Sequence, residues 1–142
     1  MLDVISIGSA TQDVFVHVPE KFLEKHSFVF KPGTKIEIEQ VETFTGGGAT
    51  NTATGFARLG LKAGIMSSIG EDESAEKIIK KMKNEKINTK LLKKLKGKRT
   101  AYSVILTGFG RDRVILHYAK AAKISDGENP NKLNASWFYV SS

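Results

Sequence analysis

The segment FTGGGATNTA, Phe44–Ala53, decides the expected fold. Its three consecutive glycines permit positive φ values and let the backbone approach a ligand closely. From Ala49 onward the apolar residues follow a helical period, and Gly60 marks the end of this helix. A glycine turn that leads into a helix directs free N–H groups and the positive end of the helix dipole toward one point, so we expect an electron-rich ligand there. Asn51 lies in the first helical turn and can both donate and accept hydrogen bonds, which suits a ligand with hydroxyl groups.

A glycine triplet alone also fits a hairpin tip or a close backbone crossing, so the neighbouring segments matter. Val4–Gly8 is a short apolar run that ends in glycine, which is typical of a buried strand in an α/β sheet. Asp13 follows near the expected C-terminal end of this strand, where open α/β sheets bind their ligands. An acid at this place can also be a turn or helix cap. Its pairing with Gly46–Asn51 favours a ligand contact.

Two segments with alternating polar and apolar residues, Val14–Val18 and Lys35–Val41, separate the first strand from the first helix. A standard doubly wound fold passes directly from strand to helix. We therefore expect an inserted β-flap over the site. Further along the chain, Tyr102–Leu106 and Arg113–Tyr118 flank a glycine-containing turn and predict a hairpin that adds to this flap.

The remaining segments complete an α/β pattern. Lys62–Gly70 and Trp137–Val140 are candidate core strands, Ser74–Lys86 is an amphipathic helix, and Asn88–Lys98 is expected at the surface. With 142 residues and 40% hydrophobic content, the chain is large enough for one globular domain with a real core.

Composition limits the class of protein. No apolar run reaches membrane-spanning length, and Met1–Gly8 is a strand pattern with an early acid, unlike a signal peptide. The chain has no cysteine, which excludes disulfides and thiolate metal sites. This is compatible with the reducing cytoplasm, where we expect the protein. The three histidines lack the i,i+4 spacing of a metal site, so we expect no bound metal.

The net charge of +7 is concentrated in one segment. Residues 77–99 hold eleven of the 22 Lys and Arg residues, with Glu85 as the only acid. Solvated faces of surface helices are commonly rich in lysine, and no aromatic residue lies among these lysines to stack on bases. We therefore expect no nucleic-acid partner.

In order and spacing, these segments resemble the ribokinase family of carbohydrate kinases, also called the PfkB family. The resemblance rests on Gly8-Ser9 after the first strand, Asp13, two flap strands, the Gly46–Asn51 tract at a helix start, and Arg58-Leu59-Gly60, and it extends to Ile69-Gly70-Glu71-Asp72. It covers residues 2–142. It implies an α/β fold, a ribokinase-like three-layer sandwich with a small β-sheet lid. Residues 1–142 are then the N-terminal portion of a single domain, with lid strands at approximately 13–45 and 100–119.

The resemblance also implies substrate contacts. Asp13 matches the aspartate that binds substrate hydroxyls in the family. The glycine–asparagine tract matches the sugar site; its residues here are Gly46, Gly47, Gly48 and Asn51. Thr11 stands where some members have an asparagine against the sugar, and Tyr102 lies on a strand of the lid that closes over the substrate.

Two departures from the family pattern bear on the substrate. Ribokinase has a lysine in the glycine tract where this chain has Gly48, which puts ribose in doubt. Several members have Gly-Ala-Asn after the second lid hairpin strand, where this chain reads Lys120-Ala121-Ala122. The sequence therefore leaves open a sugar, a nucleoside or a sugar acid.

The catalytic half of the family pattern is missing from this sequence. Family members carry the nucleotide site, the anion hole and the catalytic base in a later Asp-Thr-x-Gly-Ala-Gly-Asp motif, which does not occur in these 142 residues. The complete enzyme would use ATP and Mg²⁺. We therefore expect no catalytic residue and no nucleotide site in this chain, which would be inactive alone.

Three further expectations accompany this interpretation. A non-catalytic polyol-binding or interaction module is the main alternative function. A Rossmann dinucleotide site is a weaker one, because the strand before the glycines alternates like a flap instead of being apolar throughout. An amphipathic flap needs covering, so we expect a homodimer through the lid, lined by phenylalanines: Phe15, Phe28, Phe30, Phe44 and Phe109.

Overall fold

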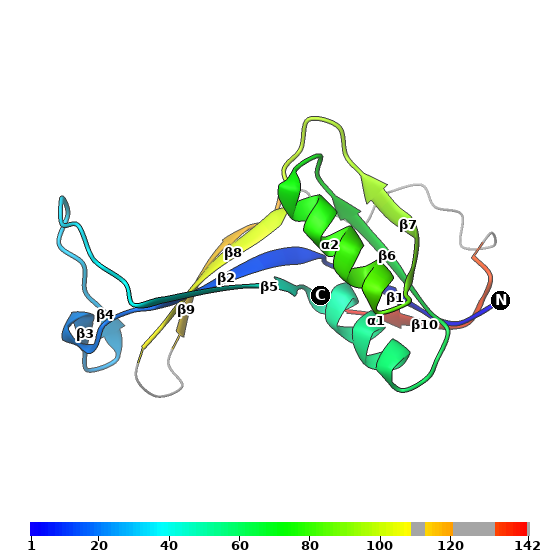
Figure 1. The fold of residues 1–142 in the computed structure, drawn as a ribbon, viewed down its shortest axis with the longest axis horizontal. Coiled ribbons are helices and arrows are strands. Elements are labelled where there is room, and N and C mark those ends of the chain that lie inside the picture. Colours follow the sequence, from blue (N-terminus) through cyan, green and yellow to red (C-terminus); the bar gives the residue numbers. More distant parts are fainter. Residues whose placement is uncertain (109–112, 121–132, 142) are drawn as a thin grey trace.

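The computed structural model describes residues 1–108, 113–120 and 133–141, which form two four-stranded β-sheets, a small two-stranded sheet and two α-helices (Figure 1). Phe109, Ala121 and Ala122, which were named above, lie outside the described residues. One sheet and both helices form an α/β core, and the second sheet projects from it as a lid. The predicted fold class, an α/β core with a β-sheet lid, is confirmed.

The core sheet contains four parallel strands in the order β10-β1-β6-β7. They are β1 (Leu2–Ile7), β6 (Ala63–Ile69), β7 (Asn88–Lys94) and β10 (Ala135–Val140). β6 is buried along its whole length, as expected for an inner parallel strand. Asn88–Lys98 lies at the surface as expected, with no buried residue, but its first seven residues also form the edge strand β7, which was not predicted. Lysines hide the strand pattern there, and lysines on an edge also discourage pairing with another chain.

Both helices pack on one face of this sheet. α1 (Gly48–Arg58) lies over β1 and β6, and α2 (Glu73–Asn84) lies over β7. Each helix ends as expected: Gly60 takes a left-handed conformation after α1, and Asp72 caps α2 by accepting a hydrogen bond from Ala75 N. The fully buried side chains of this face form one core; it includes Val4, Ala49, Ala53, Ile65, Ile69, Ala75, Ile78 and Met82.

The lid is a four-stranded sheet in the order β5-β2-β8-β9. Its strands are β2 (Thr11–His17), β5 (Gln40–Gly46), β8 (Ala101–Thr107) and β9 (Arg113–Tyr118). The predicted β8–β9 hairpin is confirmed. A short 3-10 turn (Glu20–Phe22) and two two-residue strands, β3 (Leu23–Glu24) and β4 (Ser27–Phe28), form the lid tip.

The strand predicted over Lys35–Val41 is displaced along the sequence. In the structure β5 begins at Gln40, which pairs with His17, the last residue of β2. Pro19 lies two residues after the end of β2, and it has no N–H group with which to extend the β2–β5 pairing. Residues 35–39 therefore find no strand to pair with, although their sequence alternates.

Lid and core are joined by a hydrogen-bonded contact between the start of α2 and the start of β8. Asp72 accepts hydrogen bonds from the backbone N–H of Thr100 at 2.8 Å and from its hydroxyl at 2.6 Å. The Thr100 hydroxyl is also bonded to the backbone N–H of Gly70, 3.0 Å away. The base of the lid is thereby held to the carboxyl end of β6.

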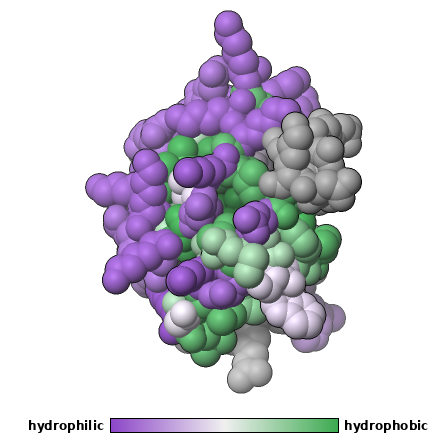
Figure 2. Space-filling model, turned by 90° about the vertical axis from the view of Figure 1, so that its right-hand side faces the viewer, coloured by the Kyte–Doolittle hydropathy of each residue, from purple (hydrophilic) through white to green (hydrophobic). Residues whose placement is uncertain are grey.

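An apolar surface marks the end of the molecule that carries β10 and the C-terminal end of α1 (Figure 2). Trp137 and Val140 on β10 are 75% and 68% exposed, and Leu59 after α1 is 79% exposed. Tyr139 packs edge-on against Phe56 of α1. Apolar exposure of this extent is typical of a surface that another polypeptide covers.

Candidate functional site

The site expected at the base of the lid is built from neighbouring strands β2 and β5. Thr11 and Asp13 lie two residues apart on β2, so their side chains point to the same side of the lid, which we call the Asp13 face. Thr11 Oγ1 donates a 2.9 Å hydrogen bond to Asp13 Oδ1. This bond orients the carboxylate, and within the described part of the chain Oδ2 has no hydrogen-bond partner, so it could accept a hydroxyl group.

Gly46 makes room for this carboxylate. It pairs with Thr11 in the antiparallel ladder, and a Cβ atom at residue 46 would lie 2.6 Å from Asp13 Cγ and 2.9 Å from Thr11 Oγ1. No side chain fits there without moving Asp13. The structure thus brings together Thr11, Asp13 and Gly46, as predicted from the sequence.

The next two glycines contact the loop that follows β1. Gly47 precedes α1 with a φ of 98°, and its backbone packs against Ser9. The N–H groups of Gly48 and Ala49 donate to the hydroxyl and the carbonyl oxygen of Ser9, each at 3.0 Å. The expectation that the glycine turn directs free N–H groups at a ligand is therefore wrong for these two groups, because the loop after β1 already satisfies them.

Two polar residues on the Asp13 face were not predicted from the sequence. Ser103 on β8 is the register partner of both Asp13 and His117, and its hydroxyl lies 3.1 Å from His117 Nδ1. These side chains extend the polar surface across three strands. Only the pairing of β8 with β2 reveals them, since neither residue stands in a recognisable sequence motif.

An aromatic pair borders the carboxylate on the same face. Phe44 is the register partner of Asp13, and its ring contacts that of Phe15 edge-on, with centroids 5.7 Å apart. Phe44 remains 53% exposed. The carboxylate of Asp13 therefore lies beside an accessible apolar wall.

Two predicted contacts lie elsewhere. Tyr102 pairs with Gln12 instead of Asp13, which places it on the opposite side of the lid, the Tyr102 face. There it lines a hollow at the start of α2 together with Arg99 and Tyr118. Asn51 is exposed and lines a hollow between α1 and α2. The structure does not bring either residue next to Asp13.

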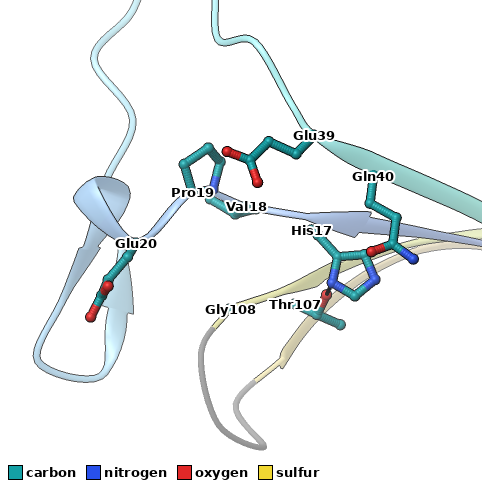
Figure 3. Close-up of a pocket in the computed structure, with 8 residues that line it drawn as sticks. All are labelled: His17, Val18, Pro19, Glu20, Glu39, Gln40, Thr107 and Gly108. Carbon is teal, nitrogen blue, oxygen red and sulfur yellow. Dashed lines mark hydrogen bonds between the residues drawn. The ribbon is translucent and has the colours of Figure 1, made fainter.

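A further hollow of about 520 Å³ lies far from Asp13, at the junction of the lid sheet and the lid tip (Figure 3). His17 enters it from β2; its Nδ1 lies 3.3 Å from the Thr107 hydroxyl and its Nε2 lies 3.3 Å from a Glu42 carboxylate oxygen. Glu20, Glu39 and Gln40 complete the polar lining. These contacts hold the lid strands together, and none of them involves the predicted site.

Two absences hold for the part of the chain that the structure describes. No three or more His, Asp or Glu side chains gather there in a way that could hold a metal ion. Within the same residues, no helix has the length and apolar character needed to cross a membrane.

Comparison with known proteins gives relatives along the whole chain. The model of the pfkB family carbohydrate kinases matches residues 1–141. A nucleoside kinase of Methanocaldococcus jannaschii is 27% identical over 140 residues, which are 99% of this chain and 44% of that protein. A 5-dehydro-2-deoxygluconokinase of Clostridium tetani is 32% identical over 99 residues, which are 67% of this chain and 24% of that protein.

Solved structures agree on the fold. The crystal structure of the M. jannaschii nucleoside kinase, an archaeal member of the ribokinase family, matches with a TM-score of 0.80 and 24% identity over 99% of this chain and 44% of that chain. The ribokinase from Cryptococcus neoformans var. grubii serotype A, in complex with ADP, matches with a TM-score of 0.75 and 21% identity over 99% and 42%. The chain spans less than half the length of these relatives. Because the family match runs from residue 1 to residue 141, the chain belongs to the pfkB family of carbohydrate kinases.

Proposed function

We propose that this chain supplies the acceptor-binding half and the lid of a kinase that transfers phosphate from ATP to a hydroxyl group of a sugar or a related compound. The observation that carries the proposal is the Thr11–Asp13 pair packed against Gly46. A carboxylate fixed by one hydrogen bond, with its second oxygen open, can orient two neighbouring hydroxyl groups of an acceptor.

The phosphate donor would be bound by residues outside this chain. Transfer needs charge stabilisation at the phosphates and usually Mg²⁺. The described residues do not fit that task, since they hold no cluster of metal ligands and Ser9 occupies the N–H groups of Gly48 and Ala49. We propose that ATP and Mg²⁺ belong to the complete enzyme and that the 142-residue chain alone does not turn over substrate.

For the acceptor, the aromatic pair beside Asp13 favours a nucleoside over a sugar acid. The exposed Phe44 ring, supported edge-on by Phe15, offers an apolar surface next to the hydroxyl-binding carboxylate. A nucleoside has both parts, a ribose with vicinal hydroxyls and a planar base that can pack on a ring. A sugar acid would bring a negative charge close to Asp13.

The kinase proposal is tested in a longer protein that contains this chain and the missing half. We would measure ATP-dependent phosphorylation of a panel of nucleosides, sugars and sugar acids for the parent protein and for Asp13→Asn. The variant keeps the shape of the side chain but loses its charge, and kcat/KM should fall by about a hundredfold or more. Glu42→Gln, on the same face of the lid but beside His17, is the control and should keep most of the activity. Equal activity of Asp13→Asn and the parent would overturn the proposal.

The alternative is a non-catalytic polyol-binding or interaction module that uses the same site. Calorimetry of the 142-residue chain with the best acceptor of the panel separates the two. Binding by the chain, with no phosphorylation in any longer product of its gene, would favour the module. Phosphorylation by the purified 142-residue chain would refute the claim that it lacks the catalytic half.

A further inference from the structure

We propose that a groove behind strand β5 is a second binding site, which takes a small anion with hydroxyl groups, such as a phosphate ester of a polyol. The groove lies on the Tyr102 face of the lid, between β5 and helices α1 and α2. It consists of two hollows, of about 300 and 380 Å³, which share Thr45 and Lys81 in their lining. Volumes of this size hold a small molecule. The proposal goes beyond the kinase function, which uses the opposite face.

The charge around the groove is positive. Lys77 and Lys81 line one hollow, and Lys81 and Arg58 line the other. Two carboxylates accompany these three cations. Glu85 bonds both Arg58 and Lys81 at 2.6 Å, and Glu73 pairs with Lys77 at 2.8 Å.

Three cations and two carboxylates leave one excess positive charge for a ligand. Hydrogen bonds from Arg58 and Lys81 lower the pKa of Glu85 to about 2, so one ionised carboxylate is shared between two cations and an excess positive charge remains. The Lys77–Glu73 pair is an exposed i,i+4 pair, a weak interaction from which an anion can draw the lysine.

Uncharged polar groups face the same space without partners. Among the described residues, none forms a hydrogen bond with the hydroxyls of Thr43, Thr45 or Thr54, all of which line the groove. Gln12 lines it as well; the residue is only 8% exposed, and its Oε1 has no hydrogen-bond partner in the described part of the chain. A buried amide without a partner is costly, and a ligand that carries hydroxyl groups would supply one.

The residues that line the groove distinguish it from a surface that binds a polyanion such as a nucleic acid. A nucleic acid would contact the exposed lysines of β7 and the following loop, which are not part of the lining. The groove is also placed to influence the lid. Gln12 lies between Thr11 and Asp13, and Thr45 precedes Gly46, so the ligand would occupy the reverse side of the two strands that form the substrate site.

The test is an NMR titration of ¹⁵N-labelled protein at constant ionic strength with three probes: glycerol 3-phosphate, inorganic phosphate and glycerol. We expect glycerol 3-phosphate to shift the amide signals of Thr43, Thr45, Lys77 and Lys81 and to bind more tightly than either other probe. Thr45→Val removes one hydroxyl from an exposed strand, and Lys81→Gln removes one charge. Each should weaken binding by about tenfold.

Lys83→Gln is the matched control, because it removes a charge from the same helix outside the groove. It should leave the affinity unchanged, and circular dichroism checks that all variants are folded. Equal weakening by Lys83→Gln would mean diffuse attraction to the lysines and would overturn the proposal. Equally tight binding of inorganic phosphate would mean a simple anion site and would also overturn the proposal. The same holds if glycerol 3-phosphate shifts only the amide signals of Asp13 and Gly46, because the probe would then bind on the opposite face of the lid.

Discussion

The carboxylate of Asp13 fills the space that a side chain at residue 46 would need, so Gly46 and Asp13 form one structural unit. Their strands are adjacent in the lid, and Thr11, opposite Gly46, holds the other carboxylate oxygen. Glycine is therefore needed at residue 46 because the Asp13 carboxylate occupies the space of a side chain, and not because the chain makes a flexible turn there.

Gly46→Ala should therefore disable the proposed substrate site while the protein stays folded. The added Cβ would lie 2.6 Å from Asp13 Cγ, so the carboxylate has to rotate away from Thr11. We expect acceptor affinity to fall by about tenfold or more, measured by calorimetry or as KM of the proposed longer kinase.

Gly55→Ala provides the control for this change. Gly55 is an exposed residue of α1, and a methyl group added there would meet no other atom within 4 Å. Alanine in a helix interior should stabilise the protein by about 0.5 to 1 kcal/mol.

Unchanged affinity in Gly46→Ala would show that the carboxylate does not need its observed orientation.

The sequence predicted the order of elements well because each strongly periodic segment carries its own signal. Val4–Gly8, Ser74–Lys86 and the β8–β9 hairpin all formed close to their predicted bounds. Of the residues predicted to bind substrate, the structure brings together Thr11, Asp13 and Gly46, where local chemistry and family pattern coincide. The remaining features depend on contacts between distant segments. Strand register places Tyr102 on the far face.

Two other differences between the prediction and the structure also arise from contacts between distant segments of the chain. Ser9, far from α1 in sequence, satisfies the N–H groups at its start, so a glycine turn does not by itself leave those groups free. The edge strand β7 pairs in parallel with β6, but its two apolar residues, Leu91 and Leu92, are adjacent and flanked by lysines, so its sequence lacks the alternation that predicts a strand. Neither feature can be read from a local window of sequence.

Stability should depend on pH through Asp72, which caps α2 and bonds Thr100. Partial burial acts to raise the pKa of Asp72, but hydrogen bonds from the Thr100 hydroxyl and the backbone N–H groups of Thr100 and Ala75 outweigh it and hold the pKa below its ordinary value of 3.8. Because the folded-state pKa is the lower one, the stabilisation is complete above the unfolded-state value and is lost as pH falls through the folded-state value.

Asp72→Asn should lower the free energy of unfolding by about 1 to 2 kcal/mol at pH 7. The difference from the parent should shrink below about pH 4, measured by urea denaturation across pH. Glu73→Gln, which removes only an exposed ion pair, should show little change. A difference that stays constant down to about pH 2 would show that the carboxylate charge is not responsible.

Buried hydroxyls should affect stability in opposite directions according to their hydrogen bonds. Ser6 Oγ and Ser67 Oγ have no partner within the described residues, although both side chains are buried in the core sheet. Ser6→Ala and Ser67→Ala should each raise the free energy of unfolding by about 0.5 to 1 kcal/mol. Thr50 donates to the carbonyl oxygens of Gly46 and Gly47, so Thr50→Val should cost about 1 kcal/mol. Denaturant titration of the three variants decides the sign of each effect.

The lid should pair with the lid of a second copy of the chain. Apolar side chains are exposed on both of its faces: Ile115 on the Asp13 face, and Leu116 and Val41 on the Tyr102 face. A free lid would leave all of them in water, and burying them between two copies is favourable.

Analytical ultracentrifugation measures this association. We expect a reversible dimer for the parent and a monomer for the double variant Ile115→Lys/Leu116→Lys, since each lysine would place an unpaired charge in the interface. Leu59→Lys, on the apolar surface at the opposite end of the molecule, keeps the lid intact and should leave the dimer unchanged. If Leu59→Lys abolished association and the lid variant did not, the dimer would form through the exposed end of the core sheet, and the lids would be free to move independently.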